Sequence, residues 1–149
     1  MTLNKTLTAT VYIVYQNKVL LHMHKKHQSL FPIGGHLESY ELPHEAAYRE
    51  AVEEAGLEVS LYNNQESLGM TRVRQLPHPQ YTLLENIGHP VENLDFIYFA
   101  TAMTFEVNPQ AGESRELYWL DVNEVQSHPQ IKEHIRLMAL KALEVMSEA

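Results

Sequence analysis

Three glutamates on a short predicted helix are the strongest candidates for chemistry in this sequence. Pro43 suits the first helical position and Gly56 the stop, because proline fixes a helical φ and glycine tolerates a left-handed one. At about 100° per residue, one face of this helix carries Glu50, Glu53 and Glu54. Carboxylates this close repel one another unless a cation lies among them, and hard divalent cations prefer oxygen ligands. The spacing therefore indicates a metal site, or alternatively an acidic face that is merely solvated.

Two neighbouring features favour the metal site. The Gly34-Gly35 pair precedes the helix, and glycines let the backbone approach a ligand closely. Arg49 stands beside the acids, one helical turn from Glu53, where it can orient a carboxylate. The opposite face is predicted to pack against a sheet through four residues, Tyr48, Ala51, Val52 and Ala55.

The segment from Gly35 to Leu57 resembles the Nudix box. That pattern is G, five residues, E, seven residues, R-E-U-x-E-E-x-G-U, where U is a bulky aliphatic residue. Eight positions fit it: Gly35, Glu41, Arg49, Glu50, Glu53, Glu54, Gly56 and Leu57. Two positions depart. Ala51 replaces a bulky aliphatic residue, which changes packing volume, and Ile33 separates Pro32 from the glycine pair, which is expected to alter the path of the loop.

The resemblance implies a Nudix-type α/β/α sandwich with a mixed β-sheet, formed by residues 1–149 as a single domain. It also implies a pyrophosphohydrolase that uses Mg²⁺, with Mn²⁺ as a substitute, to split a diphosphate with water. Arg49 receives an orienting role and Glu41 a supporting one, and which glutamate acts as the general base stays open, with Glu50 and Glu53 as catalytic candidates. The implied metal ligands are a backbone carbonyl at Gly34 and the side chains of Glu50, Glu53 and Glu54.

A second acidic run lies downstream of the helix. Glu113, Glu116 and Trp119 form an E-x-x-E-x-x-W pattern that resembles a common Nudix feature. Glu113 is the preferred further metal ligand, although either acid could complete the site or serve as the base. The alternative is two solvent-facing acids in a turn, and Trp119 is expected in the core.

Basic residues near the glycine loop are candidates to bind phosphate. Lys25 and Lys26 precede the loop, and Arg72 and Arg74 share one face of a predicted strand. Lys26, Arg72 and Arg74 are taken as the candidate substrate-binding residues, with solvated cations as the alternative.

Three histidines lie close together, with His22 and His24 on one face of a predicted strand and His27 in the following loop. A metal site is one interpretation, and ordinary polar side chains are the more common one, because no further ligand has a convincing spacing.

The expected substrate is a nucleoside triphosphate or another nucleoside-diphosphate-linked compound. The main alternative is a nucleotide-sensing Nudix module without turnover, although such a sensor would not need all three helix acids. An isoprenoid-diphosphate isomerase would need a cysteine in the family's usual chemistry, and the chain has none.

Composition limits the partners and the compartment. The chain has 149 residues and a formal net charge of −8, which argues against binding nucleic acid or a membrane surface. Neither a signal sequence nor an apolar stretch long enough to span a bilayer is evident, so the cytoplasm is the expected location. A homodimer is left open.

The remaining segments predict a mixed sheet covered on both faces. Strands are expected at residues 7–15, 19–24, 57–61, 68–76, 81–84, 94–103 and 116–120, with 94–103 central. A short helical turn is expected at 121–125, and a last helix is expected to start at Pro129 and to run to about Met146.

Overall fold

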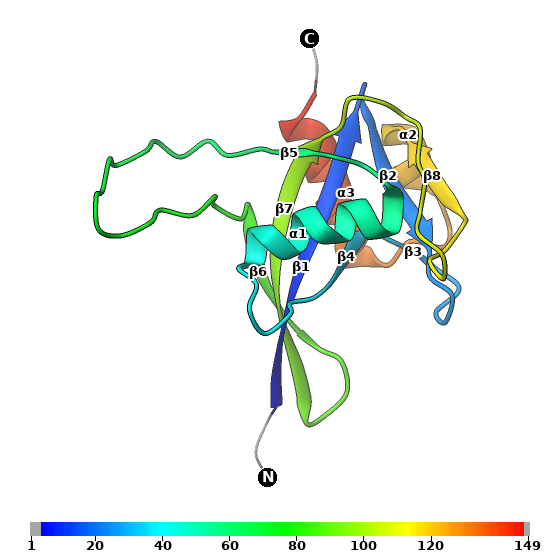
Figure 1. Ribbon diagram of the computed structural model, residues 1–149. Helices are drawn as coiled ribbons and strands as arrows, with labels where there is room; N and C mark the ends of the chain where they lie inside the picture. Colours follow the sequence, from blue (N-terminus) through cyan, green and yellow to red (C-terminus); the bar gives the residue numbers. More distant parts are fainter. Residues whose placement is uncertain (1–3, 148–149) are drawn as a thin grey trace.

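The two longest strands form the centre of a mixed sheet (Figure 1). The computed structural model describes residues 4–147 and pairs β1 (Asn4–Tyr15) in parallel with β7 (Val91–Thr101), Thr8 lying opposite Asp95. The β-branched and aromatic residues of both segments favour this extended pairing. The other strands are β2 (Lys18–Met23), β3 (Leu30–Phe31), β4 (Ile33–His36), β5 (Ser60–Leu61), β6 (Tyr81–Asn86) and β8 (Leu117–Leu120).

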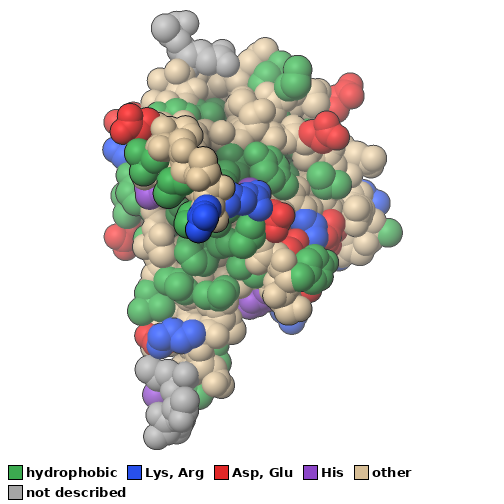
Figure 2. Space-filling model, turned by 60° about the vertical axis from the view of Figure 1, so that its left-hand side comes forward, with side chains coloured by type: hydrophobic (Ala, Val, Ile, Leu, Met, Phe, Trp, Pro, Cys, Tyr) green, Lys and Arg blue, Asp and Glu red, His purple; other side chains and the backbone are tan. Residues whose placement is uncertain are grey.

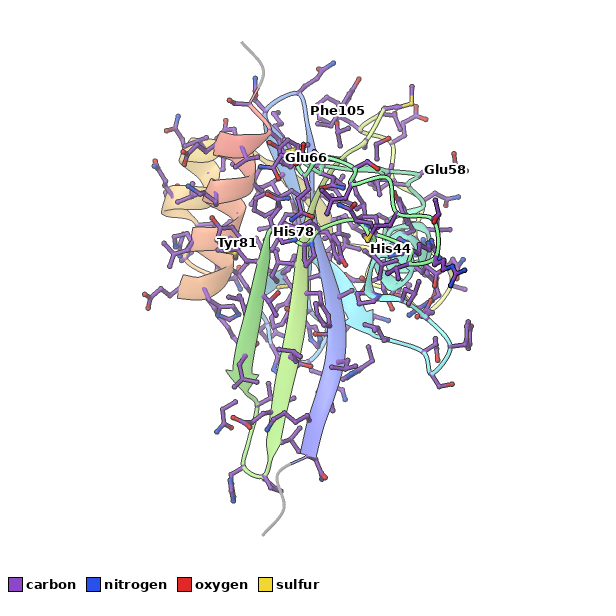
Figure 3. All side chains as sticks on the ribbon, turned by 90° about the vertical axis from the view of Figure 1, so that its left-hand side faces the viewer. His44, Glu58, Glu66, His78, Tyr81 and Phe105 are labelled. Atoms are coloured by element: carbon purple, nitrogen blue, oxygen red, sulfur yellow. The ribbon has the colours of Figure 1, made fainter. Side chains whose placement is uncertain are left out.

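Alternating side chains of β1 bury into two separate cores, one on each face of the sheet. Val11 and Ile13 pack under α1 (Pro43–Glu50) and the π-helical turn η1 (Ala51–Ala55). Tyr12 and Val14 pack under α3 (Glu133–Val145), beside α2 (Val122–Ser127). Figure 3 shows the layers from the side, with α3 and α1 on opposite sides of the strands. The predicted α/β/α sandwich is confirmed.

Most predicted strands are present, with some changes in length. The first two extend to residues 4–15 and 18–23, joined by Gln16 and Asn17 with φ of 47° and 63°. The strand predicted at 94–103 is β7, which pairs with β1, β5 and β6 and is therefore central. The strand predicted at 57–61 is reduced to Ser60–Leu61, whereas that predicted at 81–84 extends to Tyr81–Asn86.

The strand predicted at residues 68–76 is wrong. Residues 62–80 contain neither helix nor strand, and they project from the sheet as a long loop (Figure 1). Leu68, Met70 and Val73 suggested a strand, but they are 64%, 49% and 64% exposed. Apolar side chains specify a strand only when a neighbouring strand and a core receive them, and here none does.

Two details of the helices also differ from the predictions. Ala51 and Ala55 are fully buried as expected, but Tyr48 and Val52 are exposed, and Ala46 and Ala47 fill the core instead. The last helix starts at Glu133 rather than at Pro129, because the chain is extended at Lys132. None of the helices within residues 4–147 is long and apolar enough to cross a membrane.

Candidate active site

The helix that carries the acids begins and ends as its sequence predicts. Pro43 occupies the first turn, and the Leu42 N–H donates to Glu45 Oε1 at 2.9 Å, which satisfies one backbone group at the helix start. The helix ends at Gly56, whose φ is 67°. A Cβ on Gly56 would lie 2.3 Å from the Asn108 carbonyl oxygen, so glycine is needed there for space as well as for conformation.

The last turn of this helix is a π turn, which regular helical spacing does not predict. The Gly56 N–H donates to the carbonyls of Ala51 and Val52, and the turn spans Ala51–Ala55. Residues in a π turn advance by a smaller angle than in an α-helix, and such turns are frequent at functional sites. Within this turn Glu53 faces Arg49, at ordinary i,i+4 spacing, while Glu54 faces Gly34.

The glycine pair lies directly against two of the helix acids. The Gly34 N–H donates to Glu54 Oε1 at 2.8 Å. A Cβ on Gly35 would lie 2.6 Å from Glu50 Oε1. The glycines are predicted from the sequence to let the backbone approach a ligand. In the structure they approach the acids, at β4, which pairs with β1.

Arg49 joins three carboxylates. Its Nε donates to Glu41 Oε2 at 2.6 Å and its Nη2 donates to Glu41 Oε1 at 2.9 Å. Its Nη1 donates to Glu50 Oε1 at 2.8 Å and to Glu53 Oε2 at 3.0 Å. The guanidinium lowers the pKa of Glu41 and is itself held charged, with a pKa raised chiefly by its hydrogen bonds to Glu41. This planar group fixes the acids in one geometry.

Glu54 is the most strongly perturbed acid of the cluster. Its pKa is raised to about 8, chiefly by burial, with a smaller contribution from the negative charges of Glu50 and Glu113 and against the effect of the Gly34 N–H. Burial also raises the pKa of Glu50, against the effect of Arg49. Carboxylates with these raised pKa values are stabilised by a nearby cation.

The structure separates the three histidines. His22 is buried, with Nε2 3.9 Å from Glu54 Oε2, and burial lowers its pKa. His24 instead packs against His27 and Phe31, at ring-centroid distances of 4.5 and 4.7 Å. Only His22 therefore adjoins the helix acids.

The downstream acids also lie in different places. Glu113 is close enough to influence the pKa values of Glu50 and Glu54, and Lys25 donates to the neighbouring Gly112 carbonyl. Glu116 is exposed.

Trp119 packs at the edge of the core, as expected. Its Nε1 donates to the Phe105 carbonyl at 2.9 Å, and it contacts the Phe105 ring. Phe105 is labelled in Figure 3.

Two of the predicted substrate-binding residues lie away from the sheet. Arg72 and Arg74 are exposed in the loop 62–80, and Arg74 acts electrostatically on His44 of α1. Figure 2 shows the side from which this loop projects, with cationic side chains lying close to apolar ones on the surface. Lys26 is exposed beside His27, which does line the large cleft described next.

A cleft of about 1030 Å³ opens on the α3 side of the sheet and reaches Gly34 and Gly35. Its floor carries Thr8 and Thr10 of β1 with Asn93 and Asp95 of β7. The sequence did not predict this cleft. The alternation of apolar and polar residues along a strand does not show which part of a sheet face a helix covers. The glycine pair is shared by the cleft and the acid cluster, so a molecule in the cleft adjoins the acids.

The donor set fits a hard divalent cation, since it consists of carboxylate oxygens beside backbone. Within residues 4–147, no three acidic or imidazole side chains already form a ligand cluster for a metal ion. In this structure the three helix acids are bonded to other groups: Glu50 and Glu53 accept from Arg49, and Glu54 accepts from the Gly34 N–H.

Comparison with known proteins agrees with this fold. A Nudix hydrolase from Clostridium perfringens is 41% identical, with 96% of this chain and 99% of that chain covered and a TM-score of 0.88. A MutT protein from Methanosarcina mazei Go1 shares the fold at 11% identity, with 99% of each chain covered and a TM-score of 0.73. A UDP-X diphosphatase also shares the fold at 14% identity, with 97% of this chain and 65% of that chain covered and a TM-score of 0.69. No curated protein gave a significant match.

The fold and the similarity to the Clostridium perfringens enzyme thus define a hydrolase of the α/β/α sandwich class. The family model of the NUDIX domain matches residues 4–140, and the chain belongs to the Nudix family. It is a Nudix pyrophosphohydrolase.

Proposed function

We propose that the chain, as a single domain of residues 1–149, is a magnesium-dependent hydrolase of nucleoside triphosphates or other nucleoside-diphosphate-linked compounds. The observation that carries this proposal is the Arg49 network, which fixes Glu41, Glu50 and Glu53 next to the glycine pair. That pair also borders a cleft large enough for a nucleoside.

Four acids are the proposed side-chain ligands of the metal. Glu50, Glu53 and Glu54 with the Gly34 carbonyl would hold Mg²⁺, or Mn²⁺ as a substitute, and Glu113 would add a further oxygen. The bound metal would neutralise charge on the diphosphate and orient the attacking water.

The other residues have distinct proposed roles. Arg49 and Glu41 act as positioning residues, because Glu41 holds Arg49 and Arg49 in turn holds Glu50 and Glu53. Glu50 and Glu53 are the candidate acceptors of the proton from water, since both lie in the cluster and contact Arg49. Lys26, which adjoins cleft-lining His27, would meet phosphate at the cleft mouth. Arg72 and Arg74 would reach substrate only through movement of the loop 62–80.

The alternative of a nucleotide sensor without turnover is disfavoured by the complete and organised acid set. Sensing needs no network that holds three carboxylates in one geometry. Location in the cytoplasm, a partner set without nucleic acid or membrane, and a homodimer stay predictions from the sequence.

A substrate panel tests the proposed function. The protein is incubated with nucleoside triphosphates, nucleoside-diphosphate sugars and dinucleoside polyphosphates, with Mg²⁺, with Mn²⁺ or with chelator. Phosphate and pyrophosphate are measured separately. Hydrolysis of at least one nucleotide class that chelator abolishes is expected. Hydrolysis that persists undiminished in chelator would contradict the metal requirement.

A further inference from the structure

One face of the sheet changes from apolar to polar along its length. Under the middle of α3 this face carries the buried residues Tyr12, Val14 and Phe99. Towards the start of β1 it carries Thr8, and the polar residues opposite on β7 are Asn93 and Asp95. A core face gains nothing from such residues, because buried polar groups must find partners. The polar end is the floor of the cleft.

The hydrogen bonds of this floor all lead towards Asp95. Thr6 Oγ1 donates to Asn93 Oδ1 at 2.8 Å, and Asn93 Nδ2 donates to Thr8 Oγ1 at 2.8 Å. Thr8 Oγ1 in turn donates to Asp95 Oδ1 at 3.0 Å. Thr10 Oγ1 lies 2.9 Å from both oxygens of Asp95. Each hydroxyl has a single proton to donate, so this network ends on the carboxylate.

Asp95 keeps acceptor capacity after these bonds are made. An ionised carboxylate has about four acceptor positions, whereas Thr8 and Thr10 supply two protons, both from the β1 side. Burial raises the pKa of Asp95, and the Thr10 and Thr8 hydroxyls oppose that rise. A donor on a ligand would therefore find a fixed, poorly solvated acceptor, the condition under which a hydrogen bond discriminates most strongly.

Apolar residues form part of the cleft wall, which suits a flat ring. Leu83 of β6, Ile97 of β7 and Ile135 of α3 line it beside Asp95. Phe31 also lines it, with Lys132 Nζ 5.1 Å from its ring centroid. A second acid, Glu85, lies on β6 opposite Asn93, 3.8 Å from His134. Apolar walls with a few fixed polar groups are typical of a site that binds a heterocycle.

We propose that this cleft holds the base of a nucleotide and that Asp95 accepts a hydrogen bond from an exocyclic amino group, making it a specificity-determining residue. The enzyme then prefers amino-bearing bases to their oxo counterparts. Thr8 and Thr10 position the carboxylate. This inference rests on the proposed hydrolysis of nucleotides, and it names the substrate class within that function.

Matched pairs of nucleotides test the proposal. ATP and ITP differ by an amino group in place of an oxo group, and so do CTP and UTP. For the parent enzyme with Mg²⁺, kcat/KM should be about tenfold or more higher for ATP than for ITP, and for CTP than for UTP. Asp95→Asn offers an amide N–H to the base, so the ratio should fall to about one or invert. Glu144→Gln makes the same carboxylate-to-amide change at an exposed position of α3, and it should leave the ratio unchanged.

Binding without turnover separates this proposal from the proposed function. Dissociation constants of ATP and ITP are measured by calorimetry in chelator, for the parent and Asp95→Asn. If the protein binds ATP more tightly than ITP in chelator but hydrolyses neither in Mg²⁺, the cleft assignment is supported and the proposed function is wrong. Hydrolysis with equal kcat/KM within both pairs, or no binding of any nucleotide, would overturn the cleft assignment. If Asp95→Asn does not fold, the kcat/KM ratios of the parent for ATP over ITP and CTP over UTP decide. Thr10→Val should then lower these ratios, because it removes one of the two hydroxyls that position Asp95.

Discussion

The backbone N–H of Gly34 donates to Glu54 Oε1 at 2.8 Å, which joins strand β4 to the last turn of the helix that carries the acids. The neighbouring Gly35 lies against Glu50. The glycine pair therefore sets the positions of two acids, and each glycine does so through a different contact.

Alanine at the two glycines should have different effects. A Cβ on Gly34 would lie 2.6 Å from the Ala9 carbonyl oxygen, so Gly34→Ala should lower the melting temperature by several degrees or prevent folding. A Cβ on Gly35 would instead displace the flexible side chain of Glu50. Gly35→Ala should keep most of the stability and lower kcat about tenfold or more. Melting curves and kinetics of both variants check this, and a fully active Gly35→Ala enzyme would contradict the role of Glu50.

Arg49→Lys should lower kcat more than it raises KM. Lysine keeps the positive charge but loses the planar fork that holds Glu41, Glu50 and Glu53 together. We expect a fall of about tenfold or more in kcat. The measurement is steady-state kinetics at saturating Mg²⁺. A normal kcat with a much higher KM would show that Arg49 binds substrate instead of positioning the acids.

Stability without metal should fall as pH rises from 4.5 towards 8. The folded-state pKa of Glu54 is raised to about 8 from an ordinary value of 4.5. In this window the folded protein binds more protons than the unfolded chain, so the free energy of unfolding decreases as pH rises and stays low above the window. Glu54→Gln should remove that decrease and be more stable than the parent at pH 8, by up to a few kcal/mol.

Chemical denaturation of both proteins in chelator, from pH 5 to pH 8, measures this difference. Taking parent minus variant cancels the groups that do not interact with Glu54. The difference therefore reports Glu54 together with its neighbours, among them His22, whose lowered pKa acts in the opposite direction. Parallel pH curves for the two proteins would mean that Glu54 has an ordinary pKa.

The sequence predicts the parts of this site that depend on local geometry. Pro43 and Gly56 bound the helix as expected, because their backbone preferences act without help from distant residues. The Arg49 network follows from residues on one helix with Glu41 shortly before it. The π turn at residues 51–55 is not predicted, because its formation depends on packing between the helix end and the chain near Asn108.

The sequence predictions are wrong or incomplete where the structure of a segment depends on residues far away in the chain. The apolar residues at 68–76 suggested a strand, yet no neighbouring strand receives them. The Asp95 network joins residues about 85 positions apart, through the parallel register of β1 and β7. No local pattern marks Asp95, because a lone acid in an apolar strand gives no sign of its partner.

The most direct test compares two glutamates that differ in whether they belong to the cluster. Glu53 contacts Arg49 in the acid cluster, whereas Glu58 is exposed beyond the helix end, where Figure 3 shows it at the periphery. Turnover of the best substrate is measured at saturating Mg²⁺ for Glu53→Gln and Glu58→Gln. Glu53→Gln should lose two or more orders of magnitude, about 3 kcal/mol of transition-state stabilisation, while Glu58→Gln keeps the parent rate. Equal, parent-like turnover of both variants would contradict the assignment of this cluster as the catalytic site.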